Sequence, residues 1–247
     1  MSAAPPSPRL PDPRARRRRG LASLLAPPLA LGLAASLLAP PAGARPLAPR
    51  YPERRFMVGL DGVAFLTPAL HPRLVRLDAR YVGETTTLGG GGIFGRWRIA
   101  DRIGLEATVR SGSLRLRNPS TGDVVAQDVL LADLGVLLYL ARGEIGQLAI
   151  DAGVGGIGHQ LRYDLADGRQ GSQRFGGLST RVGVDIELLL RRVALVFALR
   201  AHGVVSDPRR ASVRGDAFAG APPDQREPPL PAHQTWIVGS LGLAYRF

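Results

Sequence analysis

The stretch LSTRVGVDIEL, residues 178–188, alternates strictly between two kinds of side chain. The first set is apolar apart from one threonine: Leu178, Thr180, Val182, Val184, Ile186 and Leu188. The second set is small or charged: Ser179, Arg181, Gly183, Asp185 and Glu187. Because successive side chains of a β-strand point to opposite faces, this pattern predicts a strand with one apolar and one polar face.

The same alternation recurs along the chain, with very little helical periodicity. It predicts eight strands at about 55–66, 84–99, 103–115, 127–140, 147–162, 173–190, 192–205 and 234–247. The connections alternate between tight turns near 101, 143 and 191 and long loops at 67–83, 116–126, 163–172 and 206–233. This rhythm predicts an all-β fold, an eight-stranded antiparallel up-and-down transmembrane β-barrel over 55–247, with its short turns in the periplasm.

Residues 1–44 are typical of a cleavable signal peptide. Arg14 and Arg16 to Arg19 form a charged n-region, a Leu/Ala-rich run covers 21–38, and Ala42-Gly43-Ala44 offers small residues for cleavage. An uncleaved signal anchor is the alternative. Residues 45–54 would then form a short periplasmic tail.

Composition excludes several kinds of site. The chain has 247 residues and no cysteine, which excludes disulfides, thiolate metal ligands and a lipid-modified cysteine. Its net charge of +12 falls partly in the first 44 residues, where six arginines and one aspartate stand. No basic run with interleaved aromatic residues follows, so we expect no nucleic-acid partner. We also expect no metal and no cofactor.

The direction of the two faces follows from residue size. The polar set mixes Gly, Ala and Ser with charged residues, which suits a crowded lumen, whereas a soluble lipocalin-like barrel would bury the apolar set. Charges on this face balance, which favours a salt-bridge network across the lumen. Its members would be Asp61, Arg96, Arg98, Glu106, Arg110, Asp133, Asp151, Arg181, Asp185, Glu187, Arg200 and Arg246. A bulge in a Gly-rich segment would swap the faces locally.

Four aromatic residues belong to the apolar face of the predicted strands, at the end of the barrel that has the short turns: Phe56, Trp97, Tyr245 and Phe247. Aromatic side chains are enriched where a barrel crosses a membrane interface, so we interpret them as an interfacial girdle. Ordinary core aromatics are the alternative.

Two segments resemble bacterial outer-membrane barrels. The chain ends in LGLAYRF, residues 241–247, which resembles the terminal strand of that class, and GGGGIFGRWRIADRIGLEA, residues 89–107, is similar to a hairpin of small OmpA/OmpW-like barrels. The resemblance implies a location in the outer membrane. The chain departs from OmpA itself in that it stops at the last strand, so we expect no peptidoglycan-binding domain. The resemblance also implies recognition of Tyr245 and Phe247 by the barrel assembly machinery.

An eight-stranded barrel has room inside only for side chains, so we expect a plugged, non-enzymatic protein with a structural or surface-interaction role. Outer-membrane lipid and lipopolysaccharide are the expected partners. Arg73, Arg76 and Arg80 of the loop 67–83 would contact phosphates of the lipopolysaccharide. A solvated loop without such a contact is the alternative.

Two other functions stay open. A path for a small apolar molecule could be lined by four apolar residues at inward-facing positions of the predicted strands: Val63, Phe65, Leu131 and Leu137. A lipid A acyl hydrolase or transferase would need a serine activated by histidine. The four histidines are His71, His159, His202 and His233, and His202 with Ser206 or Asp207 is the nearest approach to such a pair.

Overall fold

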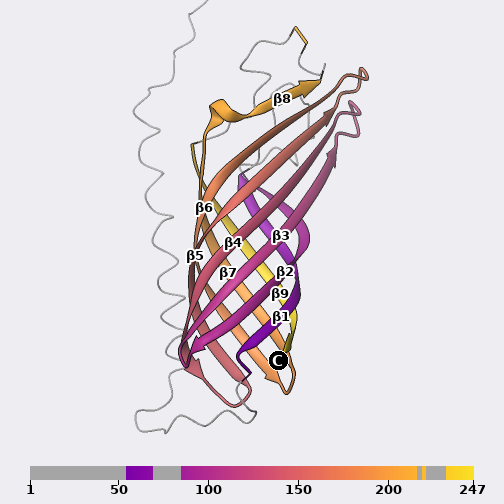
Figure 1. Ribbon diagram of the computed structural model, residues 1–247. Helices are drawn as coiled ribbons and strands as arrows, with labels where there is room; N and C mark the ends of the chain where they lie inside the picture. The colour runs from indigo at the N-terminus through magenta and orange to yellow at the C-terminus, as the bar shows by residue number, and fades with distance from the viewer. Residues whose placement is uncertain (1–53, 69–84, 216–218, 221–231) are drawn as a thin grey trace, which may run out of the picture. The chain divides into compact units, whose positions relative to one another are not determined.

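The computed structural model describes residues 54–68, 85–215, 219–220 and 232–247, which all lie in the compact unit Pro46–Phe247. Eight long strands make up this unit (Figure 1). They are β1 (Phe56–Pro68), β2 (Thr85–Ala100), β3 (Ile103–Arg117), β4 (Val124–Arg142), β5 (Gly146–Asp164), β6 (Gln170–Leu190), β7 (Val193–Ser206) and β9 (His233–Arg246). The predicted signal peptide, residues 45–53 of the tail, residues 69–83 of the first loop and residues 216–218 and 221–231 of the last loop lie outside the described residues.

The strands close into an antiparallel barrel. The order β5-β4-β3-β2-β1-β9-β7-β6 is completed by pairing of β5 with β6. The first and last strands pair directly, from Met57 with Arg246 to Leu66 with Ile237. Closure leaves the barrel wall without an edge strand. The prediction of an all-β, eight-stranded antiparallel barrel is confirmed.

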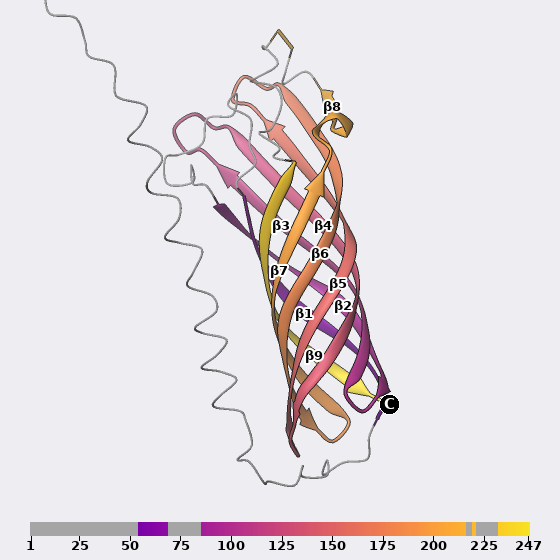
Figure 2. The same ribbon diagram turned by 90° about the vertical axis from the view of Figure 1, so that its left-hand side faces the viewer.

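The connections at the two ends differ in length. Turns at 101–102, 143–145 and 191–192 lie at the same end as the C-terminus (Figures 1 and 2). At the other end the connections 118–123 and 165–169 are shorter than the expected 116–126 and 163–172. The strands continue there because Arg115 still pairs with Ala126, and Arg162 with Ser172.

A ninth strand, β8 (Ser212–Gly215), was not expected. It follows a short 3-10 helix, η3 (Pro208–Arg210), and pairs with Gly171–Arg174 of β6. The outer ends of four barrel strands and β8 thus form a five-stranded sheet of residues 113–117, 124–128, 160–164, 170–174 and 212–215, which we call the outer sheet. Figure 1 shows the β3–β4 and β5–β6 hairpins reaching beyond the barrel wall.

The two faces of the strands separate as the alternation predicts. In β1 every second residue from Met57 to Thr67 is buried, and those between are mostly exposed. The exposed set is apolar, with Leu134, Val154 and Leu178 more than 60% exposed. Apolar side chains therefore point outward and charged ones inward, the reverse of a soluble barrel. Among the described residues, no helix combines the length and hydropathy that a bilayer crossing requires.

Candidate functional site

A carboxylate from β3 forms the centre of the lumen. Glu106 lies within 2.6 Å of Arg96 from β2, 2.8 Å of Arg181 from β6 and 2.8 Å of Arg200 from β7. All four side chains are almost completely enclosed. One residue thus joins strands on opposite walls of the barrel.

Two further carboxylates extend this centre toward β4 and β5. Asp151 lies 3.1 Å from Arg181 and 2.9 Å from Arg200, and Asp133 lies 3.6 Å from Arg181. The hydroxyl of Ser179 donates to Asp133 at 3.0 Å. The two arginines therefore each contact several carboxylates, which reduces the cost of burying their charge.

Toward the short-turn end, Arg96 carries the network further. It contacts Asp185 at 2.5 Å and Glu187 at 2.6 Å. The hydroxyl of Tyr139 donates to Glu187 at 2.9 Å. Arg98 lies 4.0 Å from Glu187, donates to Gln147 and stands over the Tyr139 ring at 4.1 Å. This end mixes ion pairs with neutral hydrogen-bond partners and one cation–π contact.

Three predicted members stand apart from this network. Arg110 and Asp61 form a separate ion pair at 2.7 Å between β3 and β1. Arg246 points inward and is buried, yet it donates to the backbone carbonyl of Arg191 at 3.3 Å rather than to a carboxylate. The structure thus places all twelve predicted residues inside the barrel and joins eleven of them in ion pairs.

Sequence reasoning missed Tyr139, Gln147 and Ser179, which contact the charged groups through neutral side chains. Their inward-facing positions in the alternating pattern could have indicated that they lie in the lumen beside the charged groups. The sequence also did not reveal why the inward face is rich in glycine. A Cβ atom on Gly183 would lie 2.6 Å from Cγ of Arg200, and one on Gly153 would lie 2.9 Å from Nε of Arg181. These glycines provide the space that the arginine side chains occupy.

Beyond the charges, an apolar cluster lies in the lumen. Its members are Val63, Phe65, Leu88, Val129, Leu131, Ile157, Val204, Trp236 and Val238. Three of the four residues considered for an apolar path lie in this cluster, and Leu137 packs with Tyr139 and Ala149 instead. These side chains are buried inside the barrel and pack within their own clusters.

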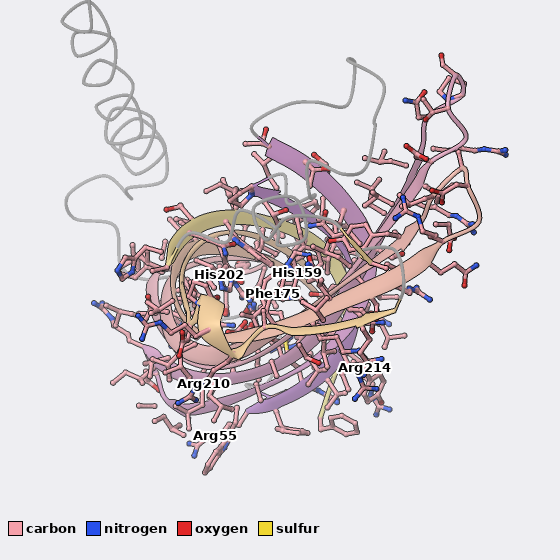
Figure 3. All side chains as sticks on the ribbon, turned by 90° about the horizontal axis from the view of Figure 1, so that it is seen from above. Arg55, His159, Phe175, His202, Arg210 and Arg214 are labelled. Carbon is pink, nitrogen blue, oxygen red and sulfur yellow. The ribbon has the colours of Figure 1, made fainter. Side chains whose placement is uncertain are left out.

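Two histidines point into the same region (Figure 3). His159 packs on Phe175 with ring centroids 4.6 Å apart and on Trp236 at 5.7 Å. His202 is buried on β7, and neither histidine has a hydrogen-bond partner among the described residues. Ser206 lies four residues further along the same face, about 13 Å away at 3.3 Å per residue. The two therefore do not form the nucleophile–base pair that an acyl hydrolase needs.

The Asp207 carboxylate contacts residues of η3 rather than His202. It accepts the backbone N–H of Arg209 at 3.0 Å and lies 3.4 Å from Arg210. Within the described ranges, His, Cys, Asp and Glu form no group of three or more that could hold a metal ion.

The four predicted girdle residues point outward at the short-turn end. Phe56 pairs across the strands with Trp97, and its ring lies 5.9 Å from that of Phe247. The rings of Tyr245 and Phe247 are 5.0 Å apart. All four belong to the neighbouring strands β2, β1 and β9 and the residue that follows, so they form a patch on one side rather than a ring.

No protein-family profile matches the chain, and no curated protein matches its sequence. Solved structures do match. Ail, the attachment invasion locus protein of Yersinia pestis, is 10% identical with a TM-score of 0.50, over 79% of this chain and 100% of Ail. At this identity the similarity concerns the fold, which is that of a small outer-membrane β-barrel.

Two other solved structures match less closely. OprG from Pseudomonas aeruginosa is 15% identical over 81% of this chain and 99% of its own, with a TM-score of 0.47. The protease OmpT from Escherichia coli is 10% identical over 78% and 97%, with a TM-score of 0.37.

Proposed function

We propose that this protein is an integral outer-membrane β-barrel without enzymatic activity, in which a plugged lumen provides a rigid anchor for the outer sheet and loops. The observation that carries the proposal is the inversion of its two faces. An apolar outer surface surrounds a lumen filled with buried ion pairs. Only a bilayer makes that arrangement favourable, because in water the outer surface would remain exposed.

The strand lengths support this location. A tilted strand needs about 9–11 residues to cross a bilayer, and the eight barrel strands have 13 to 21. Short turns face the periplasm in bacterial barrels, which supports a location of the outer sheet on the cell surface. The residues beyond the bilayer are then available for surface interactions.

The filled lumen supports a structural role over transport. Arg96, Arg181 and Arg200 reach across the interior, and the apolar cluster occupies the space beyond them. A molecule crossing the barrel would have to separate several buried ion pairs, which costs several kcal/mol for each partner left alone.

Fractionation and conductance test the proposal together. The full chain should appear in the outer-membrane fraction and should give no unitary conductance steps in planar bilayers. Regular conductance steps would overturn the plugged lumen, and recovery in the periplasmic fraction would overturn the location. Lipid A from cells with and without the protein should carry the same acyl chains, and a changed acyl pattern would overturn the non-enzymatic role.

A further inference from the structure

We propose that the outward face of β1 to β6, together with β8, binds one phosphate-bearing lipid of the outer leaflet, with its phosphates on a band of arginines and an acyl chain in an apolar groove below. The proposal rests on the proposed membrane location and deepens it, because it names a ligand class and a site for it.

The arginines form a row across the outer sheet. Arg115 on β3 pairs with Ala126, which pairs with Arg162 on β5. Arg162 in turn pairs with Ser172, which pairs with Arg214 on β8. Neighbouring strands lie about 4.8 Å apart, so these arginines follow one another at about 10 Å. Such spacing suits an extended headgroup with more than one phosphate.

Two more arginines border this row, Arg117 on β3 and Arg174 on β6, and we call the five together the arginine band. Two carboxylates share its face, Asp128 and Asp164, so the band carries a net charge of +3. Asp128 pairs with Arg162 at 2.6 Å. The other four arginines are exposed and form no ion pair within the part of the chain that the structure describes. They are therefore available to an external anion.

The acidic residue of the nearby β5–β6 loop does not compete for them. Asp167 accepts both the backbone N–H of Arg169 at 3.1 Å and its side chain at 2.8 Å. These hydrogen bonds lower the pKa of the Asp167 carboxyl. The loop thus pairs its own charges.

An apolar groove of about 780 Å³ lies on the same outward face, nearer the middle of the barrel. Its floor includes small residues on three adjacent strands: Gly95 on β2 pairs with Ala107 on β3, and Ala132 lies on β4. Larger exposed side chains border it: Val58, Ile93, Val109, Leu134, Val154 and Leu178. Within an apolar belt, a groove of this kind fits a hydrocarbon chain.

Groove and band share strands and lie one above the other. On β6, Leu178 of the groove is four residues from Arg174, or about 13 Å along the strand. On β3, Val109 is six residues from Arg115, or about 20 Å. A lipid with its phosphates on the band would therefore extend its acyl chains toward the groove. Neither a soluble anion nor an apolar molecule would use both parts.

A second copy of the chain fits this face less well. A two-fold dimer would bring identical surfaces together, so the two arginine bands would lie close to each other. Like charges facing each other disfavour that contact. The net charge of the face thus favours an anionic lipid over a dimer.

Native mass spectrometry of the full chain in detergent tests the proposal. The probes are diphosphorylated lipid A and its monophosphorylated form with the same acyl chains, and inorganic pyrophosphate is the soluble competitor. The wild type should retain the diphosphorylated lipid in preference. Arg115→Gln with Arg174→Gln should reduce its retention at least about tenfold. Arg209→Gln, on the exposed η3, is the matched control and should change nothing.

The groove is tested separately. Ala132→Phe should fill it and weaken binding of both lipids, whereas Ala64→Phe, outward on β1 and outside the groove, should not. Each variant is first checked for the heat-sensitive gel mobility of a folded barrel.

Three outcomes would overturn the lipid site: equal retention of the two lipids, unchanged retention in the double arginine variant, or displacement of the lipid by pyrophosphate. A dimer that disappears in Ala132→Phe would instead assign the groove to a second copy. Because this assay uses purified protein, its failure is distinct from a failure of the fractionation or conductance experiments.

Discussion

Glu106 and Arg200 lie 94 positions apart in the chain and meet inside the barrel at 2.8 Å, with both side chains completely enclosed. Their strands, β3 and β7, are not neighbours in the sheet. The contact therefore crosses the lumen and holds opposite walls together. Since Glu106 also contacts Arg96 and Arg181, it neutralises more buried charge than any single pair would.

Replacing Glu106 should therefore destabilise the barrel strongly. Glu106→Gln keeps the side-chain shape but leaves three buried arginines without one of their shared carboxylates. Loss of one partner of a buried pair costs about 3–5 kcal/mol. Reversible urea unfolding in lipid vesicles would measure this free energy.

Asp128→Asn is the matched control for that substitution. Asp128 pairs with Arg162 at 2.6 Å on the exposed face, where an ion pair contributes at most about 1 kcal/mol. If Glu106→Gln were no more damaging than Asp128→Asn, the network would not stabilise the barrel.

The direction of each side chain was predictable from the sequence, but its partners were not. Strict alternation with a period of two is sufficient to point Arg246 inward. It does not reveal that Arg246 lies by the backbone of Arg191 while Arg96 lies among three carboxylates. Partners depend on how the strands are staggered around the barrel, which no single strand encodes.

The outer sheet and the groove were missed for related reasons. The strand β8 has four residues, Ser212–Gly215, all exposed, so it shows no alternation and is held only by pairing with β6. The groove combines outward residues of six strands, β1 to β6, and needs small residues such as Gly95 and Ala107 side by side. The outer sheet and the groove exist only once the strands have paired and closed into a barrel.

Val182 should not tolerate a charge. It is 62% exposed on the outward face of β6, between Leu178 and Leu190 at the limits of the apolar stretch. A charge that faces the bilayer midplane costs about 2–4 kcal/mol, so Val182→Arg should lose that much stability in lipid vesicles. Val182→Ala should remain near the wild type. Equal stability of Val182→Arg and wild type would mean that the apolar face does not meet lipid.

Trypsin should reveal the orientation of the barrel. Arg209 and Arg210 are exposed on η3 at the end of the outer sheet, so protease added to intact cells should cut there. Arg102 and Arg191 are exposed in the short turns at the opposite end and should be cut only after the cells are permeabilised. The opposite order of cleavage would invert the assigned orientation.

Phe247 should matter more for assembly than for stability. Its backbone N–H donates to the carbonyl of Phe56 at 2.9 Å, and the residue is 61% exposed, with its ring beside those of Phe56 and Tyr245. Because little apolar area is covered, deletion should cost the folded barrel only about 1–2 kcal/mol. The resemblance of the last strand to the outer-membrane assembly signal leads us to expect a sharp fall in outer-membrane yield in cells.

Phe56→Ala separates these two effects. It removes the same aromatic contact from the other side but leaves the chain terminus intact, so it should lose similar stability and still reach the outer membrane. Outer-membrane yield by fractionation and refolding in detergent micelles are measured for both variants. If the Phe247 deletion reached the outer membrane as well as Phe56→Ala does, the terminal aromatic residue would have no role in recognition. If the Phe247 deletion failed to refold in micelles, its low yield in cells would be explained by lost stability. A variant that cannot fold on its own does not test recognition by the assembly machinery.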